Sequence, residues 1–161
     1  MLLYVSLKGS DSLERGLSRD EQRALYNACQ KEMSSAVARH RGEVVSSSGD
    51  WLFARFAPSP TRSIAATRAL GAALAMVEEV QSMYRGLVVR AGVCDSRIPP
   101  GNAEEEVNVP KALSKAVDGG VAIDEAVRGL VGEAYVVEPL PALKIPGVAE
   151  ALVSHRVRKP R

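Results

Sequence analysis

The feature that most limits the folds open to this chain is the order of its strand-like and helix-like patterns. A run of β-favouring residues at 2–7 comes first, and the polar stretch 9–12 breaks it. A helical pattern follows, whose apolar residues recur at a spacing of four and predict one buried face: Leu25, Cys29, Met33 and Val37. Ser18 and Asp20 offer cap chemistry at its start, and Gly42 ends it.

A hairpin and a second long helix are predicted next. Two β-favouring runs, 43–46 and 51–56, flank a Ser/Gly/Asp cluster and predict antiparallel neighbours. Thr61 begins an Ala-rich helix, and 87–93 is typical of a fourth strand. The predicted buried face of that helix consists of Ile64, Ala65, Ala69, Ala72, Ala73, Met76, Val77 and Val80. So many alanines predict a helix that lies close against a sheet.

The order strand, helix, strand, strand, helix, strand predicts an α+β fold with a ferredoxin-like βαββαβ core. The patterns beyond this core predict helices and strands at 109–116, 121–123, 125–130, 134–137 and 151–157. We therefore expect a C-terminal αββ extension, with residues 1–161 forming a single domain. The antiparallel hairpin excludes a doubly wound Rossmann chain, and the sequence holds no dinucleotide-binding, P-loop or zincin motif.

Composition narrows the class of protein. Hydrophobic residues make up 46% of the chain and the net charge is only +2, so a disordered chain is excluded. The longest apolar run, 69–77, is shorter than the ~20 residues of a membrane helix, and the first residues lack the basic region of a signal peptide. The near-neutral charge argues against nucleic acid or membrane as a partner, and we expect a cytoplasmic protein. Cys29 and Cys94 are expected to be reduced and buried, and His40 and His155 cannot make a His-rich zinc site.

Four short segments, taken in order, carry a likeness to a known family. Residues 42–56 form the predicted hairpin, with Gly-Asp at its turn and Phe at its end. Residues 89–93 read Val-Arg-Ala-Gly-Val, residues 107–109 read Val-Asn-Val, and residues 143–144 read Leu-Lys. In their order and spacing these segments resemble the cyclase homology domain of class III adenylate and guanylate cyclases. The resemblance runs over nearly the whole chain.

This resemblance implies a nucleotide cyclase mechanism. Two such domains pair head to tail, and the active site lies at their interface. Two aspartates of one domain bind two metal ions, Mg²⁺ or Mn²⁺, which clamp the triphosphate and activate the ribose 3′ hydroxyl. The other domain supplies a Lys and an Asp or Thr for adenine, an Asn, and an Arg that stabilises the charged transition state.

Transfer of the metal and base-reading roles to this chain exposes gaps. Asp50 stands at the second metal position, but Ser6 replaces the first carboxylate. One hydroxyl cannot hold a hard dication as a carboxylate does. The base-reading lysine falls on Ser46, and the second base-reading position falls in the loop 99–104. Ser6 and Ser46 are therefore degenerate positions in the site that the resemblance implies.

Of the remaining positions that the resemblance implies, some keep the expected type of residue and one does not. Asn108 stands at the Asn position, and Lys144 keeps the place of a phosphate-binding lysine, although Ile145-Pro146-Gly147 follows it. These two residues are vestigial catalytic candidates. Ala112 stands at the position of the transition-state arginine and is a third degenerate position. Removal of such a group costs on the order of a hundredfold or more in rate.

Each retained residue also has an ordinary structural interpretation. Asp50 suits a hairpin turn, Asn108 the start of a helix, and Lys144 a solvated surface. The acidic run 104–106 is typical of a solvated approach to a helix N-terminus rather than of a metal site. Trp51 plugs the nucleotide cleft, packs across a dimer, or is a half-exposed strand aromatic.

Three functions are open, and the first is our prediction. It is a catalytically degenerate domain that needs no cofactor, forms a homodimer or pairs with another cyclase-like domain, and acts in signal transduction as a regulatory or interaction module. The second is an active cyclase that converts ATP or GTP into a cyclic nucleotide with Mg²⁺ or Mn²⁺, with a partner chain restoring the missing groups. The third is a nucleotide-binding sensor without catalysis, which Asn108 and Lys144 favour.

Overall fold

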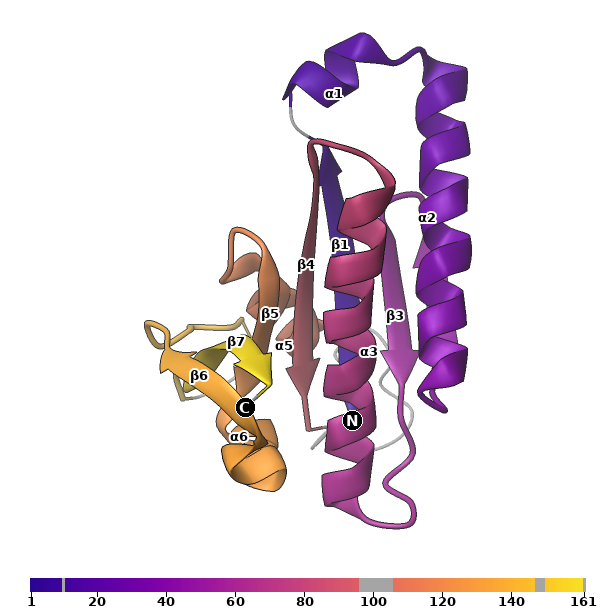
Figure 1. Cartoon of the computed structure of the whole chain (residues 1–161). Helices are drawn as coiled ribbons and strands as arrows, with labels where there is room; N and C mark the ends of the chain where they lie inside the picture. Colours follow the sequence, from indigo (N-terminus) through magenta and orange to yellow (C-terminus); the bar gives the residue numbers. More distant parts are fainter. Residues whose placement is uncertain (10, 96–105, 147–149, 161) are drawn as a thin grey trace.

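A computed structural model of the chain describes residues 1–9, 11–95, 106–146 and 150–160. Its strands are β1 (Leu2–Gly9), β2 (Glu43–Ser48), β3 (Trp51–Arg55), β4 (Leu87–Cys94), β5 (Gly120–Asp124), β6 (Tyr135–Pro139) and β7 (Ser154–Pro160). Its helices are α1 (Asp11–Gly16), α2 (Arg19–Arg39), α3 (Arg62–Met83), α5 (Asn108–Lys115) and α6 (Glu125–Val131), with a short 3₁₀ turn over Gly132–Ala134. The strands form one sheet in the order β2-β3-β1-β4-β5-β7-β6 (Figure 1).

The predicted α+β class and ferredoxin-like core are confirmed. The four core strands lie in the order β2-β3-β1-β4, and each neighbouring pair among them is antiparallel. β5 then adds to the sheet parallel to β4, and α6, β6 and β7 form the αββ extension. The last strand begins at Ser154 rather than at 151, because Leu152 forms an isolated bridge with Leu143 instead of joining the ladder.

The two long helices begin where the sequence places their caps. Ser18 accepts a hydrogen bond from the Glu21 amide while the Glu21 carboxylate accepts one from the Ser18 amide, which is a complete capping box. The Thr61 hydroxyl accepts from the Ile64 amide at 3.2 Å and caps α3. Helix α1 was not predicted, since its six residues are too few to show a period and only Leu13 anchors it in the core.

Helices α2 and α3 cover one face of the sheet, and α5 packs on the other (Figure 1). Strand β1 contributes side chains to the cores on both sides of the sheet, because successive side chains of a strand point to opposite faces. Leu3, Val5 and Leu7 belong to the larger core beneath α2 and α3, whereas Leu2 and Tyr4 join the smaller core with Leu113 of α5. The side of the sheet that carries α5 is called the α5 face below.

The packing of α3 confirms most of its predicted buried face and corrects one member. Four alanines of the predicted face have no exposed surface, and neither do Met76, Val80 and the neighbouring Ala66. Ile64 is 38% exposed and lies in the first turn of α3, which extends past the end of the sheet in Figure 1. Cys29 and Cys94 are free and buried, as expected. None of the helices in the described ranges is long and apolar enough to cross a membrane.

Candidate functional site

The predicted metal position lies in the middle of the α5 face. Ser6 of β1 stands opposite Trp51 of β3 on one side and opposite Arg90 of β4 on the other. The same line of neighbours continues to Ser48 of β2 and Gly120 of β5. We call these five residues the Ser6 row. Directly opposite residues in antiparallel strands have Cβ atoms about 5 Å apart, so the side chains of Ser48, Trp51, Ser6 and Arg90 are neighbours along the row.

An aromatic pair borders the Ser6 row. The rings of Tyr4 and Trp51 stack with centroids 6.0 Å apart and an interplanar angle of 11°. Tyr4 is buried and Trp51 is partly exposed, so the indole forms the outer layer of the stack. Trp51 is thus a half-buried strand aromatic. Its packing across a dimer stays a prediction.

The hairpin turn between β2 and β3 holds Asp50 beside this row. Gly49 takes the turn with a φ of +50°, which is a left-handed conformation that favours glycine. The side-chain amide of Gln30 on α2 donates to the carbonyls of Gly49 at 2.9 Å and Trp51 at 2.8 Å, and the amide of Leu7 donates to the Asp50 carbonyl at 2.7 Å. The turn is therefore fixed to both α2 and β1.

The electrostatics around Tyr4 link the hairpin to the row. Burial raises the pKa of the Tyr4 phenol, the negative charge of Asp50 raises that pKa further, and the positive charge of Arg90 lowers it. The Asp50 carboxylate and the Arg90 guanidinium therefore both shift the pKa of the Tyr4 phenol, which lies on the same face of β1 as Ser6. Charges of opposite sign border the predicted metal position.

Two polar atoms of the Ser6 row lack partners. The Ser6 Oγ and the Arg90 Nε are buried and make no hydrogen bond within the part of the chain that the structure describes. Most buried polar groups in folded proteins are hydrogen-bonded, so each of these two is unusual. Ser6 and Arg90 are directly opposite each other on β1 and β4, so the two atoms without partners belong to one site.

The other predicted site residues lie outside the Ser6 row. Ser46 is exposed on β2 opposite Phe53, and Asn108 is the exposed first residue of α5. Ala112 is half-buried one turn further along α5, and Lys144 is exposed between β6 and β7. The predicted second base-reading position, at 99–104, lies outside the described residues, as do Glu104 and Glu105 of the acidic run. Their roles stay predictions.

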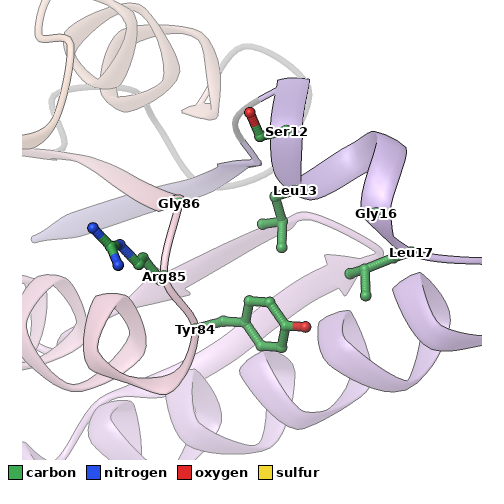
Figure 2. Close-up of a pocket in the computed structure, with 7 residues that line it drawn as sticks. All are labelled: Ser12, Leu13, Gly16, Leu17, Tyr84, Arg85 and Gly86. Carbon is green, nitrogen blue, oxygen red and sulfur yellow. The ribbon is translucent and has the colours of Figure 1, made fainter.

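The structure also holds a hollow that none of the predicted site residues lines. It has a volume of about 400 Å³ and lies between α1 and the turn that joins α3 to β4 (Figure 2). Figure 2 shows the side chains of Leu13, Leu17 and Tyr84 around it, while the Arg85 side chain points away from Leu17. Its walls bring no cluster of catalytic or metal-binding groups together.

Comparison with known proteins decides the fold family. No family model and no curated protein matches the sequence. Among solved structures, the chain is similar to the adenylyl cyclase CyaB from P. aeruginosa, at 17% identity and a TM-score of 0.81 over 99% of this chain and 93% of that one. This chain has the fold of a class III nucleotide cyclase domain.

Three further solved structures share the cyclase fold. The guanylate cyclase domain of RhGC from Catenaria anguillulae, solved with GTP, is 16% identical, with a TM-score of 0.78 over 99% of this chain and 96% of that one. A dimeric guanylyl cyclase domain of the RhoGC fusion protein from Blastocladiella emersonii is 15% identical, with a TM-score of 0.79 over 99% and 96%. A monomeric form of that domain gives a TM-score of 0.75 at 15% identity, covering 99% of this chain and 94% of that one. The likeness thus spans nearly all of this cyclase-like chain and of these solved domains.

The residues of this cyclase-like domain do not fit a divalent metal. The predicted position offers one carboxylate, Asp50, and one hydroxyl, Ser6, beside the guanidinium of Arg90. One carboxylate and one hydroxyl are a poor ligand set for a hard dication, which prefers several carboxylate and carbonyl oxygens. Elsewhere in the described ranges, no three His, Cys, Asp or Glu side chains come together as a metal group.

Sequence reasoning missed Arg90 and Gln30 as parts of this region. In the sequence Arg90 is visible only as part of the segment 89–93, because its neighbour across the sheet depends on the register of β1 against β4. Gln30 lies on the predicted helix but outside its apolar face, and its contact with the hairpin comes from tertiary packing. Alternation along the strands would have found Arg90 once that pairing was assumed.

Proposed function

We propose that this chain is a catalytically degenerate cyclase-like domain that pairs with a second cyclase-like domain and acts as a regulatory or interaction module in signal transduction. The observation that carries the proposal is the Ser6 row, where a hydroxyl lies between a guanidinium and an indole at the predicted metal position. Metal-assisted attack on a triphosphate needs carboxylates at that place. We therefore propose that this domain binds a partner domain and does not catalyse the cyclase reaction.

The opposite half of the implied site supports the same proposal. Ala112 has no group that could donate to a phosphate, and loss of one such donor reduces rates about 10²–10³-fold. A second copy of this chain would bring the same alanine, so self-pairing cannot restore the missing arginine. Heteromeric pairing would still leave Ser6 at the metal position of this chain.

The α5 face is the surface that we assign to pairing. Trp51 is partly exposed there, and partly buried apolar side chains surround the smaller core: Val107, Val109, Leu140, Leu143 and Leu152. Val153, next to this group in the sequence, is 53% exposed. Large aromatic side chains with an apolar surround are the usual anchors of protein interfaces. One structural relative is a dimer, which agrees with this assignment.

We predict that the purified chain is a dimer in sedimentation equilibrium. The substitution Trp51→Ala should raise the dissociation constant of this dimer about 10- to 100-fold. Truncation of an interface anchor typically costs about 2 kcal/mol or more, and every 1.4 kcal/mol is a factor of ten. Tyr84→Ala is the matched control, because Tyr84 is also an exposed aromatic but lines the hollow beside α1 and is not part of the α5 face. Circular dichroism checks that both variants are folded. A strict monomer at high concentration, or equal weakening by Tyr84→Ala, would contradict the proposed pairing face.

A further inference from the structure

We infer that Gln30 of α2 is a positioning residue for domain pairing, because it holds the hairpin turn that places the indole of Trp51 on the α5 face. The inference rests on the proposed function, in which Trp51 anchors a partner domain. It adds the residue that keeps this anchor in place. The observation that carries it is the pair of hydrogen bonds from the Gln30 amide to the carbonyls of Gly49, at 2.9 Å, and of Trp51, at 2.8 Å.

Gln30 belongs to a firmly packed part of α2. The preceding residue, Cys29, and the residue one turn further on, Met33, have no exposed surface and belong to the larger core. A carboxamide nitrogen carries two hydrogens, and Gln30 uses its nitrogen on two carbonyls of the hairpin. One side chain of a buried helix therefore holds the turn on both sides of Asp50.

The hairpin depends on these bonds because its outer strand has little cover. All residues from 46 to 50 are exposed, and β2 is an edge strand of the sheet. The Leu7 amide adds one hydrogen bond to the Asp50 carbonyl, at 2.7 Å. Segments with few buried contacts open more readily than the core of a protein. The two bonds from Gln30 are therefore important for the position of the turn.

The effect of Gln30 crosses the sheet. Helix α2 packs on the side of the larger core, whereas the side chain of Trp51 packs against the smaller core on the α5 face. Gln30 reaches Trp51 through the backbone carbonyl, and the indole stacks on Tyr4 on the opposite side. A shift of this backbone would move the indole away from Tyr4. The position of a residue on the α5 face is thus set in part by a helix on the other face.

The second polar atom of the carboxamide indicates that Gln30 is needed for its donors. The Gln30 Oε1 is buried and accepts no hydrogen bond within the ranges that the structure describes. A buried acceptor without a partner is unfavourable, so packing alone would favour an apolar side chain here. An apolar side chain could not donate to Gly49 and Trp51, and this donation is the property that glutamine supplies.

Two substitutions of Gln30 separate donation from packing. Gln30→Met keeps the length of the side chain and removes both donors, whereas Gln30→Lys keeps donors and has no acceptor. Trp51 is the sole tryptophan of the chain, so its spectra report its own surroundings. At concentrations where the chain is monomeric, Gln30→Met should shift the Trp51 emission to the red and increase its quenching by acrylamide. The near-ultraviolet circular dichroism of the Tyr4–Trp51 stack should be lost.

Sedimentation equilibrium measures the consequence for pairing. We expect Gln30→Met to raise the dissociation constant about 5- to 10-fold, less than Trp51→Ala, because the indole is still present but is no longer held in place. Gln30→Lys should stay within about twofold of the natural chain, because its ammonium group can donate to the same carbonyls. Far-ultraviolet circular dichroism and urea denaturation check that both variants are folded.

Gln22→Met is the matched control. Gln22 is also a half-buried glutamine of α2, but its amide donates to the Glu14 carbonyl at 3.0 Å and not to the hairpin. Removal of this donor should leave the Trp51 spectra and the dissociation constant at the values of the natural chain.

The inference is overturned if Gln30→Met leaves either the Trp51 spectra or the dissociation constant unchanged. It is also overturned if Gln22→Met has the same effect, or if Gln30→Lys loses as much affinity as Gln30→Met. The spectra are recorded on the monomer, so they test the position of Trp51 separately from pairing. A chain that never pairs contradicts the proposed function, whereas a dimer that is insensitive to Gln30 contradicts only this inference.

Discussion

Gly92→Ala is expected to destabilise this domain by about 3 kcal/mol or more, near the upper end of single-residue effects. A Cβ atom at Gly92 of β4 would lie 2.1 Å from the Pro110 carbonyl oxygen and 2.7 Å from both the Leu113 Cβ and the Ser114 amide nitrogen. Two of these three contacts are with the backbone of α5, which cannot swing aside as a side chain does. Helix α5 would have to move off the sheet, and the smaller core would open with it.

Urea denaturation of the variant and of the natural chain measures this effect. Gly129→Ala is the matched control, because a Cβ at Gly129 meets nothing within 4 Å and the residue lies inside α6. Alanine is preferred to glycine in a helix by about 0.5–1 kcal/mol, so the control should be slightly stabilising. A Gly92→Ala protein within about 0.5 kcal/mol of the natural chain would show that α5 does not pack on β4 as described.

Phe56→Ala is expected to cost about 3–5 kcal/mol, the usual range for deleting a fully buried aromatic ring. Phe56 follows β3, is 1% exposed and belongs to the larger core. Its ring occupies the place where a side chain at position 42 would lie, since a Cβ at Gly42 would come within 2.5 Å of the Phe56 Cε1. The turn that ends α2 is thereby joined to the end of the hairpin.

A double-mutant cycle tests this contact without relying on one absolute value. Gly42→Ala alone should cost about 1–3 kcal/mol through overpacking against the ring. In the Phe56→Ala background the clash is gone, so the same change should cost much less, with a coupling of about 1–2 kcal/mol. Additive effects would mean that the two residues do not touch. Both steps are measured by chemical denaturation, with circular dichroism as a check on folding.

The core of the fold could be predicted because its signals are local. The capping box at Ser18, the Thr61 cap and the alternation of β1 each depend on residues close together in the sequence. Helix α1 has one core residue and no period, and the start of β7 depends on whether Leu152 pairs with Leu143 or joins the sheet. These last features are decided by tertiary contacts, which a single sequence does not display.

The candidate site could be predicted only in part, for a similar reason. The resemblance placed Asp50 and Ser6 at the implied metal positions, and the structure puts them on the hairpin turn and on β1. That Arg90 faces Ser6 follows from the register of two strands far apart in the chain, and the clamp of Gln30 follows from the docking of α2. Arg90 places a positive charge beside Ser6, which stands where the resemblance implies a carboxylate, and Gln30 fixes the hairpin turn that carries Asp50.

The central claim is that this cyclase fold carries no cyclase chemistry, and one assay tests it directly. The purified chain is incubated with ATP or GTP and Mn²⁺, and cyclic nucleotide is measured against a protein-free background. Because Ser6 and Ala112 stand where a metal-binding carboxylate and the transition-state arginine are needed, we predict no cyclic product above that background. Robust turnover that disappears in Asp50→Ala would contradict the account.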